Sequence, residues 1–469
     1  MKLFGALLMA GVALAQNRFL PGTTPFVTVN VPVLALQHVR VIDGTGAAAR
    51  EDQTVVIDHG KIAAVGPAAS VGLPNGAQPM DLTGNTVIPG IVGMHEHLFY
   101  DSGDGIPTYN EQAFSFPRLY LACGVTTART AGSLEPYTDL SVKKLIDGGR
   151  MPGPKLWITG PYLEGKGTFA AQMHELSGPD DAVRTVDYWI SEGVTSFKAY
   201  MNITHAELKA AVDAAHKHGI KVTGHLCSIG FREAAAIGID NLEHGLLVDT
   251  EFHAGKQPDV CPNATRGEIA RLDLNSGPVL DMIADLVAHN VAITSTLAVF
   301  EAFDGSRPPL EKRFIDAVTP AAALSYLEAR ANARGGPNAP ALEELKKEMD
   351  FEYAFVKAGG LLMAGADPTG NGGALAGFAD QRNIELLVEA GFSPVQAIQI
   401  ATSNGAKFLG ELDRVGTVTA GKQADLVVID GNPASNIAAI RKVKLVFKDG
   451  AGYDPVKLLD SVKGAAGLH

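Results

Sequence analysis

Six residues of types that bind metal ions or transfer protons occur at the ends of short apolar segments. They are His95 and His97 in IVGMHEH, Lys198 in VTSFKAY, His225 in KVTGH, His244 in IDNLEH and Asp367 in LLMAGAD. Imidazole nitrogens and carboxylate oxygens are ligands that Zn²⁺ and neighbouring divalent cations accept. If these segments are strands that end at one place, their side chains form a metal site.

Lys198 needs a separate explanation, because a lysine ammonium cannot bind a metal ion. Burial and nearby cations lower the pKa of a lysine, and the neutral amine can take up CO₂ to form an anionic carbamate. A carbamate would bridge two cations, whereas an ammonium would be repelled by them. We therefore predict two divalent metal ions, with zinc as the expected metal and a CO₂-derived carbamate on Lys198.

Asp367 is predicted to be the catalytic residue of this set. Two metal ions held in this way would activate a bridging hydroxide. A carboxylate that binds one of the ions can also carry the proton of that hydroxide to a leaving nitrogen. Each of the six residues has an ordinary structural role when considered alone, so the prediction depends on their occurring together.

Tyr200 and His174 are predicted to contact the substrate. Tyr200 follows Lys198 by two positions, so in a strand both side chains point to the same side. A phenol there can stabilise an oxyanion or bind a carboxylate, and packing beneath the site is the alternative. His174 falls in the loop after the third apolar segment, and simple surface exposure is its alternative.

Eight apolar segments, separated by helical patterns, are the elements that would position these residues. They cover residues 91–97, 125–130, 156–160, 194–200, 221–225, 239–244, 291–296 and 361–367. Alternating strands and helices predict an α/β fold with parallel strands, and eight such units favour a (β/α)8 TIM barrel. No GxGxxG follows a strand, which argues against an open nucleotide-binding sheet. In a barrel, the strand ends meet at one mouth, where active sites lie.

Both ends of the chain contain further strand patterns. VLALQHVRVIDG and TVVIDHGKIAAVG lie near the amino terminus, and His59-Gly60 is typical of a two-residue hairpin turn. ADLVVIDGNP and VKLVFKDG repeat the style between residues 424 and 450. We therefore predict a small β-sandwich domain formed by residues 16–90 and 411–469, and a barrel over residues 91–410. Two long connections, 245–278 and 297–340, would cover the barrel mouth.

Charge and the amino-terminal residues restrict partners and location. The formal net charge of −12 at pH 7 opposes contact with nucleic acid phosphates, so no nucleic acid partner is expected. Residues 1–15 combine Lys2, an apolar stretch and Ala13-Leu14-Ala15, the pattern of a cleaved signal peptide. The expected mature chain begins at Gln16 and is exported to the periplasm or secreted. No other segment is apolar and long enough to span a membrane.

The three cysteines, Cys123, Cys227 and Cys261, are too few for a disulfide framework in a chain of 469 residues. We expect them to be buried as small apolar side chains. One disulfide pair with one remaining thiol is the alternative. Assembly into a homo-oligomer is left open.

Several motifs together resemble the amidohydrolase superfamily over residues 31–450. PGIVGMHEH resembles its first metal motif, and GHLCSIGFREAAAIGIDNLEHG and MAGADPTG resemble its later ligand segments. ATSNGAKFLG and VGTVTAGKQADLVVID resemble its closing helix and its return to the β domain. The resemblance implies His95, His97 and Asp367 on one metal ion and His225 and His244 on the other, with carboxylated Lys198 between them.

Within that superfamily, GVTTART and the spacing from HLC to EHG resemble the imidazolonepropionase-like and Xaa-Pro dipeptidase-like group. The group implies hydrolysis of a carbon–nitrogen bond in a small amide or peptide substrate, such as a dipeptide or an N-acyl amino acid. SFKAYM also resembles the lysine strand of hydantoinases and dihydropyrimidinases, so hydrolysis of a cyclic amide, imide or lactone is the alternative. A metal-storage or binding protein is a third reading, but it would not need Asp367.

Overall fold

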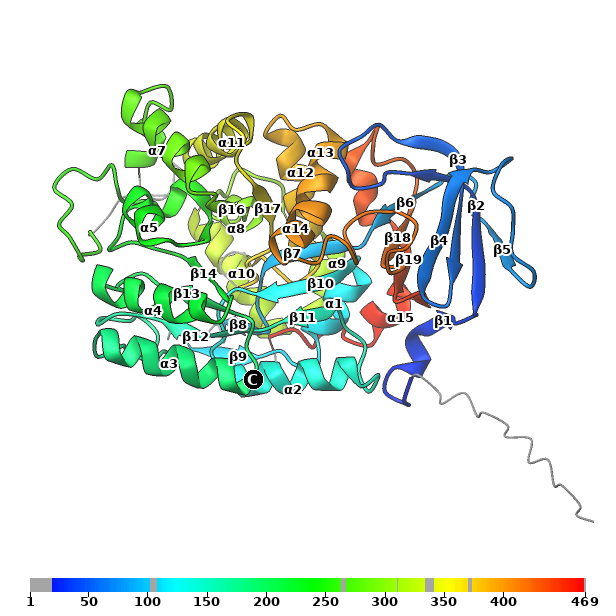
Figure 1. The fold of residues 1–469 in the computed structure, drawn as a ribbon, viewed down its shortest axis with the longest axis horizontal. Helices are drawn as coiled ribbons and strands as arrows, with labels where there is room; N and C mark the ends of the chain where they lie inside the picture. Colours follow the sequence, from blue (N-terminus) through cyan, green and yellow to red (C-terminus); the bar gives the residue numbers. More distant parts are fainter. Residues whose placement is uncertain are drawn as a thin grey trace, which may run out of the picture.

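The computed structural model describes residues 19–101, 108–262, 267–309, 311–333, 341–369 and 373–467. The predicted signal peptide therefore lies outside the described residues. The fold is mixed α/β: parallel strands with helices around them lie beside a separate sheet that both ends of the chain build (Figure 1). Within the described ranges, no helix combines the length and apolar character needed to cross a membrane.

The parallel strands belong to two hydrogen-bonded sheets. The first has the order β11-β10-β7, with bounds Lys155–Trp157, Val125–Thr130 and Ile91–Glu96. The second runs from β12 to β17 in chain order, with bounds Thr159–Leu163, Ser196–Ala199, Lys221–Gly224, Asn241–Glu243, Ala292–Ser295 and Leu362–Ala364. Each of the eight predicted segments is thus found as parallel strand.

Two connections bring the ends of these sheets together. β11 and β12 follow each other across Ile158, so the segment predicted as one strand at 156–160 is divided between the two sheets. At the other end, Asp367 N donates to His95 O over 2.9 Å, which sets the segment after β17 beside β7. All the strands therefore direct their carboxyl ends toward the same side of the molecule.

Helices follow most of these strands. The principal ones are α1 Phe116–Ala122, α2 Pro136–Asp147, α3 Pro179–Glu192, α4 His205–Lys217, α5 Phe231–Ile237, α7 Gly277–Ala288, α11 Ala341–Lys357 and α12 Phe378–Glu389. Thr204 caps α4, because its hydroxyl accepts from Glu207 N at 3.3 Å while Glu207 accepts from Thr204 N at 2.9 Å. The apolar face of α4 is buried, as the 3.6-residue period predicts.

Shorter elements occupy the two long connections and the return to the terminal sheet. After β15 come the 3₁₀ turn η2, Gly245–Val248, and α6, Glu268–Arg271. After β16 come α8 Leu297–Glu301, α9 Lys312–Ala317 and α10 Pro320–Ala333. The return contains α13 Pro394–Gln399, η4 Ile400–Asn404, α14 Gly405–Phe408, η5 Ile437–Arg441 and α15 Pro455–Asp460. A separate hairpin after β7 is formed by β8, Phe99–Asp101, and β9, Tyr109–Glu111.

The separate sheet has nine strands in the order β1-β20-β19-β18-β6-β2-β3-β4, with β5 also paired to β2. Their bounds are Val27–Val29, Ala451–Tyr453, Val443–Lys448, Leu426–Asp430, Asn85–Pro89, Val33–Val41, Arg50–Asp58 and Lys61–Pro67, and Gln78–Asp81 for β5. The predicted hairpin is present: His59 and Gly60 adopt φ angles of 46° and 82° between β3 and β4. The sheet joins both ends of the chain, as predicted.

The nine strands are connected in one hydrogen-bonded sheet, and the sandwich arrangement of that sheet stays a prediction. β2 is long enough to pair with β3 along one edge and with β5 and then β6 along the other, which connects all nine strands. Its core combines both ends of the chain, since Leu36, Val55 and Val87 pack in one cluster with Leu426 and Phe447. A larger core lies between the parallel strands and their helices.

Candidate metal centre

The structure brings the six predicted side chains together at the carboxyl ends of the parallel strands. His95 Nε2 and His97 Nε2 lie 3.4 and 3.2 Å from Asp367 Oδ1, and His244 Nδ1 lies 3.8 Å from Asp367 Oδ2. Ligand atoms of His95, His244 and Asp367 all lie within 4.8 Å of one another. A carboxylate that faces three imidazoles is a donor set that suits a divalent transition metal.

Lys198 and His225 complete the cluster. Lys198 Nζ lies 3.1 Å from His95 Nε2, and the ring centroid of His225 lies 4.6 Å from that of His244. The rings of His95 and His244 are also 4.6 Å apart. The lysine therefore lies among the histidines, as its position in β13 predicted.

Burial determines the charge states in this cluster. His95, His97, Lys198 and His244 are at most 2% exposed. Desolvation lowers the pKa of His97 to about 4 and that of His225 to about 3, so both imidazoles are neutral near pH 7 and offer lone pairs. Desolvation also lowers the pKa of Lys198 to about 8. A neutral lysine amine is therefore accessible near neutral pH.

Asp367 keeps its charge in the same surroundings. Burial would raise the pKa of its carboxyl group, but the charge of His95 and hydrogen bonds from His95 and His97 hold that pKa well below its usual range. Asp367 and His244 also have φ angles of 46° and 67°, in the left-handed region that side chains rarely adopt. Such conformations cost roughly 1–3 kcal/mol each and gather at functional sites.

Glu243 supports the cluster, and the sequence did not predict this role. Its Oε2 lies 2.7 Å from His95 Nδ1, and its Oε1 accepts from Arg129 Nη2 at 2.6 Å. Both Glu243 and Arg129 are almost fully buried. Strand alternation would point Glu243 away from its neighbour His244, but the positive φ of His244 breaks that alternation. Both side chains can therefore reach His95.

Glu348, on α11, supports the turn that follows His244. Its Oε2 accepts from Leu247 N at 2.9 Å. A Cβ on Gly245 would lie 1.9 Å from Glu348 Oε1, so this position of the turn has room only for glycine. On its other side, His244 Nδ1 lies 2.7 Å from Thr296 Oγ1, at the end of β16.

The two predicted substrate contacts differ in position. The ring of Tyr200 lies 5.0 Å from that of His225 and 5.7 Å from Lys198 Nζ, directly beside the cluster. His174 has a side chain that is 59% exposed, and its Nε2 lies 3.1 Å from Asp181 Oδ2. No interaction recorded for the described residues joins His174 to the six clustered side chains. It lines a cavity of about 420 Å³ that Tyr162 also lines.

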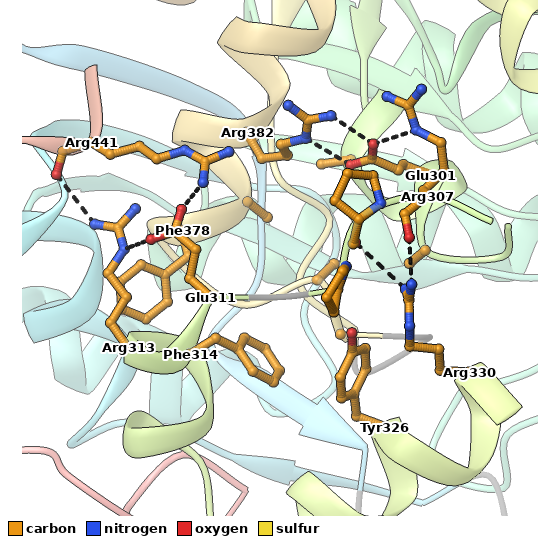
Figure 2. A pocket seen from close by; sticks show the side chains of 17 residues that line it. Glu301, Arg307, Glu311, Arg313, Phe314, Tyr326, Arg330, Phe378, Arg382 and Arg441 are labelled. Atoms are coloured by element: carbon orange, nitrogen blue, oxygen red, sulfur yellow. Dashed lines mark hydrogen bonds and ion pairs between the residues drawn. The ribbon is translucent and has the colours of Figure 1, made fainter. Parts of the chain in front are cut away.

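A second cavity, of about 140 Å³, contains none of the predicted site residues. It lies among α8, α9, α10 and α12, and Figure 2 shows charged side chains around it. Glu301 accepts from Arg307 and Arg382, each at 2.7 Å, and Arg313 donates to Glu311 at 2.7 Å. The pair between Glu301 and Arg382 joins α8 to α12.

Two of the three cysteines are paired, which corrects the expectation of three buried thiols. Cys227 and Cys261 form a disulfide, whereas Cys123 is free and buried. The residues after β15 fold back over the end of β14: Thr250 Oγ1 donates to Cys227 O at 2.5 Å, and Lys256 Nζ does so at 2.8 Å. This return brings the sulfur atoms of Cys227 and Cys261 together, and Cys227 follows His225 by two positions.

Comparisons with known proteins agree with this geometry. Residues 86–451 match the model of the amidohydrolase family. The imidazolonepropionase of Streptomyces griseus is 24% identical over 415 residues, 86% of this chain and 92% of the relative. A Xaa-Pro dipeptidase structure with bound methionine has a TM-score of 0.67 at 22% identity, covering 90% of this chain and 100% of that one. The structure of A. niger ochratoxinase has a TM-score of 0.65 at 18% identity, covering 93% of this chain and 100% of that one. The structural likenesses establish a shared fold.

Proposed function

This chain belongs to the amidohydrolase family, and on that basis we propose that it hydrolyses an amide bond in a small substrate, such as a dipeptide or an N-acyl amino acid, with the help of bound metal ions. One observation carries the proposal: Asp367 faces His95, His97 and His244 within 3.8 Å at the carboxyl ends of the strands. Barrel enzymes keep their active sites at this end.

The donor set fits two divalent ions, for which we propose zinc. His95, His97 and Asp367 would hold one ion, and His225 and His244 the other. Lys198, 3.1 Å from His95, would bridge them as a carbamate. When bound, such ions lower the pKa of a water molecule and polarise the scissile carbonyl group.

The chain's own residues would then orient the substrate and move one proton. Asp367, whose carboxylate lies 3.2 Å from His97 beside the proposed metal positions, would accept a proton from the attacking water and deliver it to the leaving nitrogen. Burial raises the pKa of Tyr200 well above its usual range, so its phenol stays protonated and can donate to a developing oxyanion or to a carboxylate. His174 would contact only a substrate long enough to reach its cavity.

We further propose that the two parallel sheets form one closed (β/α)8 barrel over residues 91–410. Residues 16–90 and 411–469 would form the accompanying β domain. We also propose that residues 1–15 are a cleaved signal peptide and that the protein is exported. The disulfide between Cys227 and Cys261 supports export, because such bonds persist in oxidising compartments.

A substrate panel tests the proposed activity. Metal-loaded protein is assayed with dipeptides, N-acyl amino acids and cyclic imides, and we expect cleavage of the linear amides. Preferential opening of the cyclic imides would favour the hydantoinase-like alternative instead. Bound metal without hydrolysis across the whole panel would contradict the proposal and favour a binding protein.

Metal content is the first prediction. The purified protein should carry close to two divalent ions, and His97→Ala should lose activity together with bound metal, because it removes a ligand that lies 3.2 Å from Asp367. His216→Ala is the matched control: this histidine lies on α4, is 41% exposed and contacts Asp240. Elemental analysis and rate measurements on both variants check the prediction. Full activity in metal-free protein would refute it.

A further inference from the structure

Aromatic side chains form a continuous wall against one side of the metal centre. We use the term aromatic wall for Phe99, Tyr109, Tyr162, Phe169 and Tyr200. The ring of Phe99 lies 4.4 Å from that of His97, and the ring of Tyr162 lies 5.6 Å from Lys198 Nζ. Tyr200 contacts His225, as described above. The wall thus touches the cluster beside both proposed metal positions.

The members of the wall also contact one another. Ring centroids are 5.2 Å apart for Phe99 and Tyr109, 4.8 Å for Tyr162 and Tyr200, and 6.1 Å for Phe169 and Tyr200. They come from the β8–β9 hairpin, from β12 with its following loop, and from the end of β13. Leu134 and Met173 belong to one apolar cluster with every member of the wall except Phe169.

Gly132 fixes the position of the wall relative to the histidines. A Cβ at this residue would lie 2.6 Å from the ring of Tyr162, so the glycine allows the ring to lie against the backbone. The carbonyl oxygen of Gly132 lies 3.2 Å from His97 Nδ1. The same short segment therefore holds both a ring of the wall and one of the clustered histidines.

The wall has space beyond it and an exposed ring at its edge. The cavity of about 420 Å³ is lined by Leu134, Tyr162 and Met173 from this cluster, and by Tyr137, Tyr188 and Trp189. Phe169 is 45% exposed, although it packs on Tyr200. A bulky apolar group placed against Phe169 would cover this apolar surface, and its removal from water would favour binding.

We propose that the aromatic wall is a specificity subsite that binds an aromatic or large apolar group beside the scissile amide. This inference rests on the proposed amide hydrolysis, because the wall is placed relative to the side chains that would act on the amide. Phe169 offers an exposed ring without a polar group, so a substrate side chain that bears a carboxylate would lose part of its hydration against this ring and gain no hydrogen bond from it.

The test compares matched peptides. Metal-loaded protein is assayed with Phe-Gly and Gly-Phe against Glu-Gly and Gly-Glu, and with the small reference peptides Ala-Gly and Gly-Ala. We expect kcat/KM for the better Phe peptide to exceed that of its Glu counterpart by about 10- to 100-fold. Phe169→Ser should lower kcat/KM for the Phe peptide about tenfold and leave that for the Ala peptide within about twofold.

Phe114→Ser is the matched control, because Phe114 is 54% exposed and stands outside the wall, over Arg118. Phe114→Ser should leave kcat/KM for the Phe peptide and for the Ala peptide unchanged. An equal loss for the Phe and Ala peptides in Phe169→Ser, or a wild-type preference for the Glu peptides, would overturn the inference.

A binding measurement separates this inference from the proposed function. Calorimetric titration of metal-loaded protein with N-acetylphenylalanine and N-acetylglutamate should show about tenfold tighter binding of the former, and Phe169→Ser should remove the difference. Selective binding without hydrolysis of any peptide would support the subsite and contradict the proposed hydrolysis. Hydrolysis without selective binding would support the proposed activity and contradict the assignment of the aromatic wall as a specificity subsite.

Discussion

At the scale of single residues, Lys198 is where charge and function are most tightly linked. It is 1% exposed among histidines, and an ammonium at that place would repel both proposed ions. We predict that Lys198→Ala lowers the rate more than about 100-fold, since metal-assisted stabilisation of the transition state is worth several kcal/mol. Short carboxylates added in solution should restore part of the rate by filling the bridging position.

Lys221→Met is a suitable control, because Lys221 begins β14 and so lies at the opposite end of the parallel strands. Its rate should stay near that of the wild type and should not respond to added carboxylate. Wild-type rates and full metal content in Lys198→Ala would reassign Lys198 to packing or substrate binding.

Glu243 supplies the second prediction at this scale. A carboxylate that receives the second nitrogen of a metal-binding histidine fixes the orientation of the ring and raises its basicity. Glu243→Gln keeps a hydrogen-bonding group 2.7 Å from His95 Nδ1 but loses the charge, so metal affinity should fall about 10- to 100-fold. Competition with a chelator measures this affinity. An unchanged affinity with lowered thermal stability would instead limit Glu243 to pairing with Arg129.

The sequence predicted the clustered residues because strand ends can be recognised one segment at a time. It did not predict Glu243, since the left-handed backbone of His244, which redirects the neighbouring side chain, leaves no mark in a pattern of apolar residues. The sequence also predicted that His174 contacts the substrate, because a position in a loop does not determine where the side chain points. The structure pairs that side chain with Asp181 at 3.1 Å.

At the scale of elements, α11 carries two buried carboxyl groups, Glu348 and Glu352, one turn apart. Burial raises the pKa of Glu352 from the ordinary 4.5 to about 8, and it raises that of Glu348 well above its usual range. The folded chain therefore keeps protons that the unfolded chain releases above about pH 4.5. The contribution of the two protonated carboxyl groups to the free energy of unfolding is fully present at low pH and declines as the pH rises toward 8.

We predict that Glu352→Gln removes much of this decline. Its melting temperature should match that of the wild type near pH 5 and exceed it by several degrees near pH 8, because the amide needs no proton. Glu343→Gln, an exposed substitution on the same helix, should change neither value. A variant less stable than the wild type at pH 8 would mean that Glu352 is ionised in the folded protein.

The break between β11 and β12 shows what apolar patterns miss at this scale. LWITG is a short and mostly apolar run, so its pattern predicts one strand. Residues before Ile158 pair with β10, and residues after it pair with β13, so the change of partner occurs inside the run. Helix α4, by contrast, was predictable from Thr204 and its apolar face alone, because both signals are local.

At the scale of the whole molecule, the amino terminus provides a direct test of export. The predicted cleavage after Ala15 should leave Gln16 as the first residue of protein isolated from its native host. Thiol titration of the same sample should detect one cysteine after unfolding without reductant, since Cys227 and Cys261 are joined. An intact Met1 on cytosolic protein, with three reactive thiols, would contradict the prediction.

The sheet that joins both ends of the chain has a consequence for synthesis on the ribosome. Strand β6 pairs with β18, and Thr86 Oγ1 donates to Gly431 O at 2.6 Å across 345 positions of sequence. At translation rates of about 5–20 residues per second, the first of these strands waits roughly 20 to 70 s for its partner to emerge. During that interval β6 has an open edge, so the nascent chain is a substrate for chaperones, and its domains cannot mature strictly in the order in which they are made.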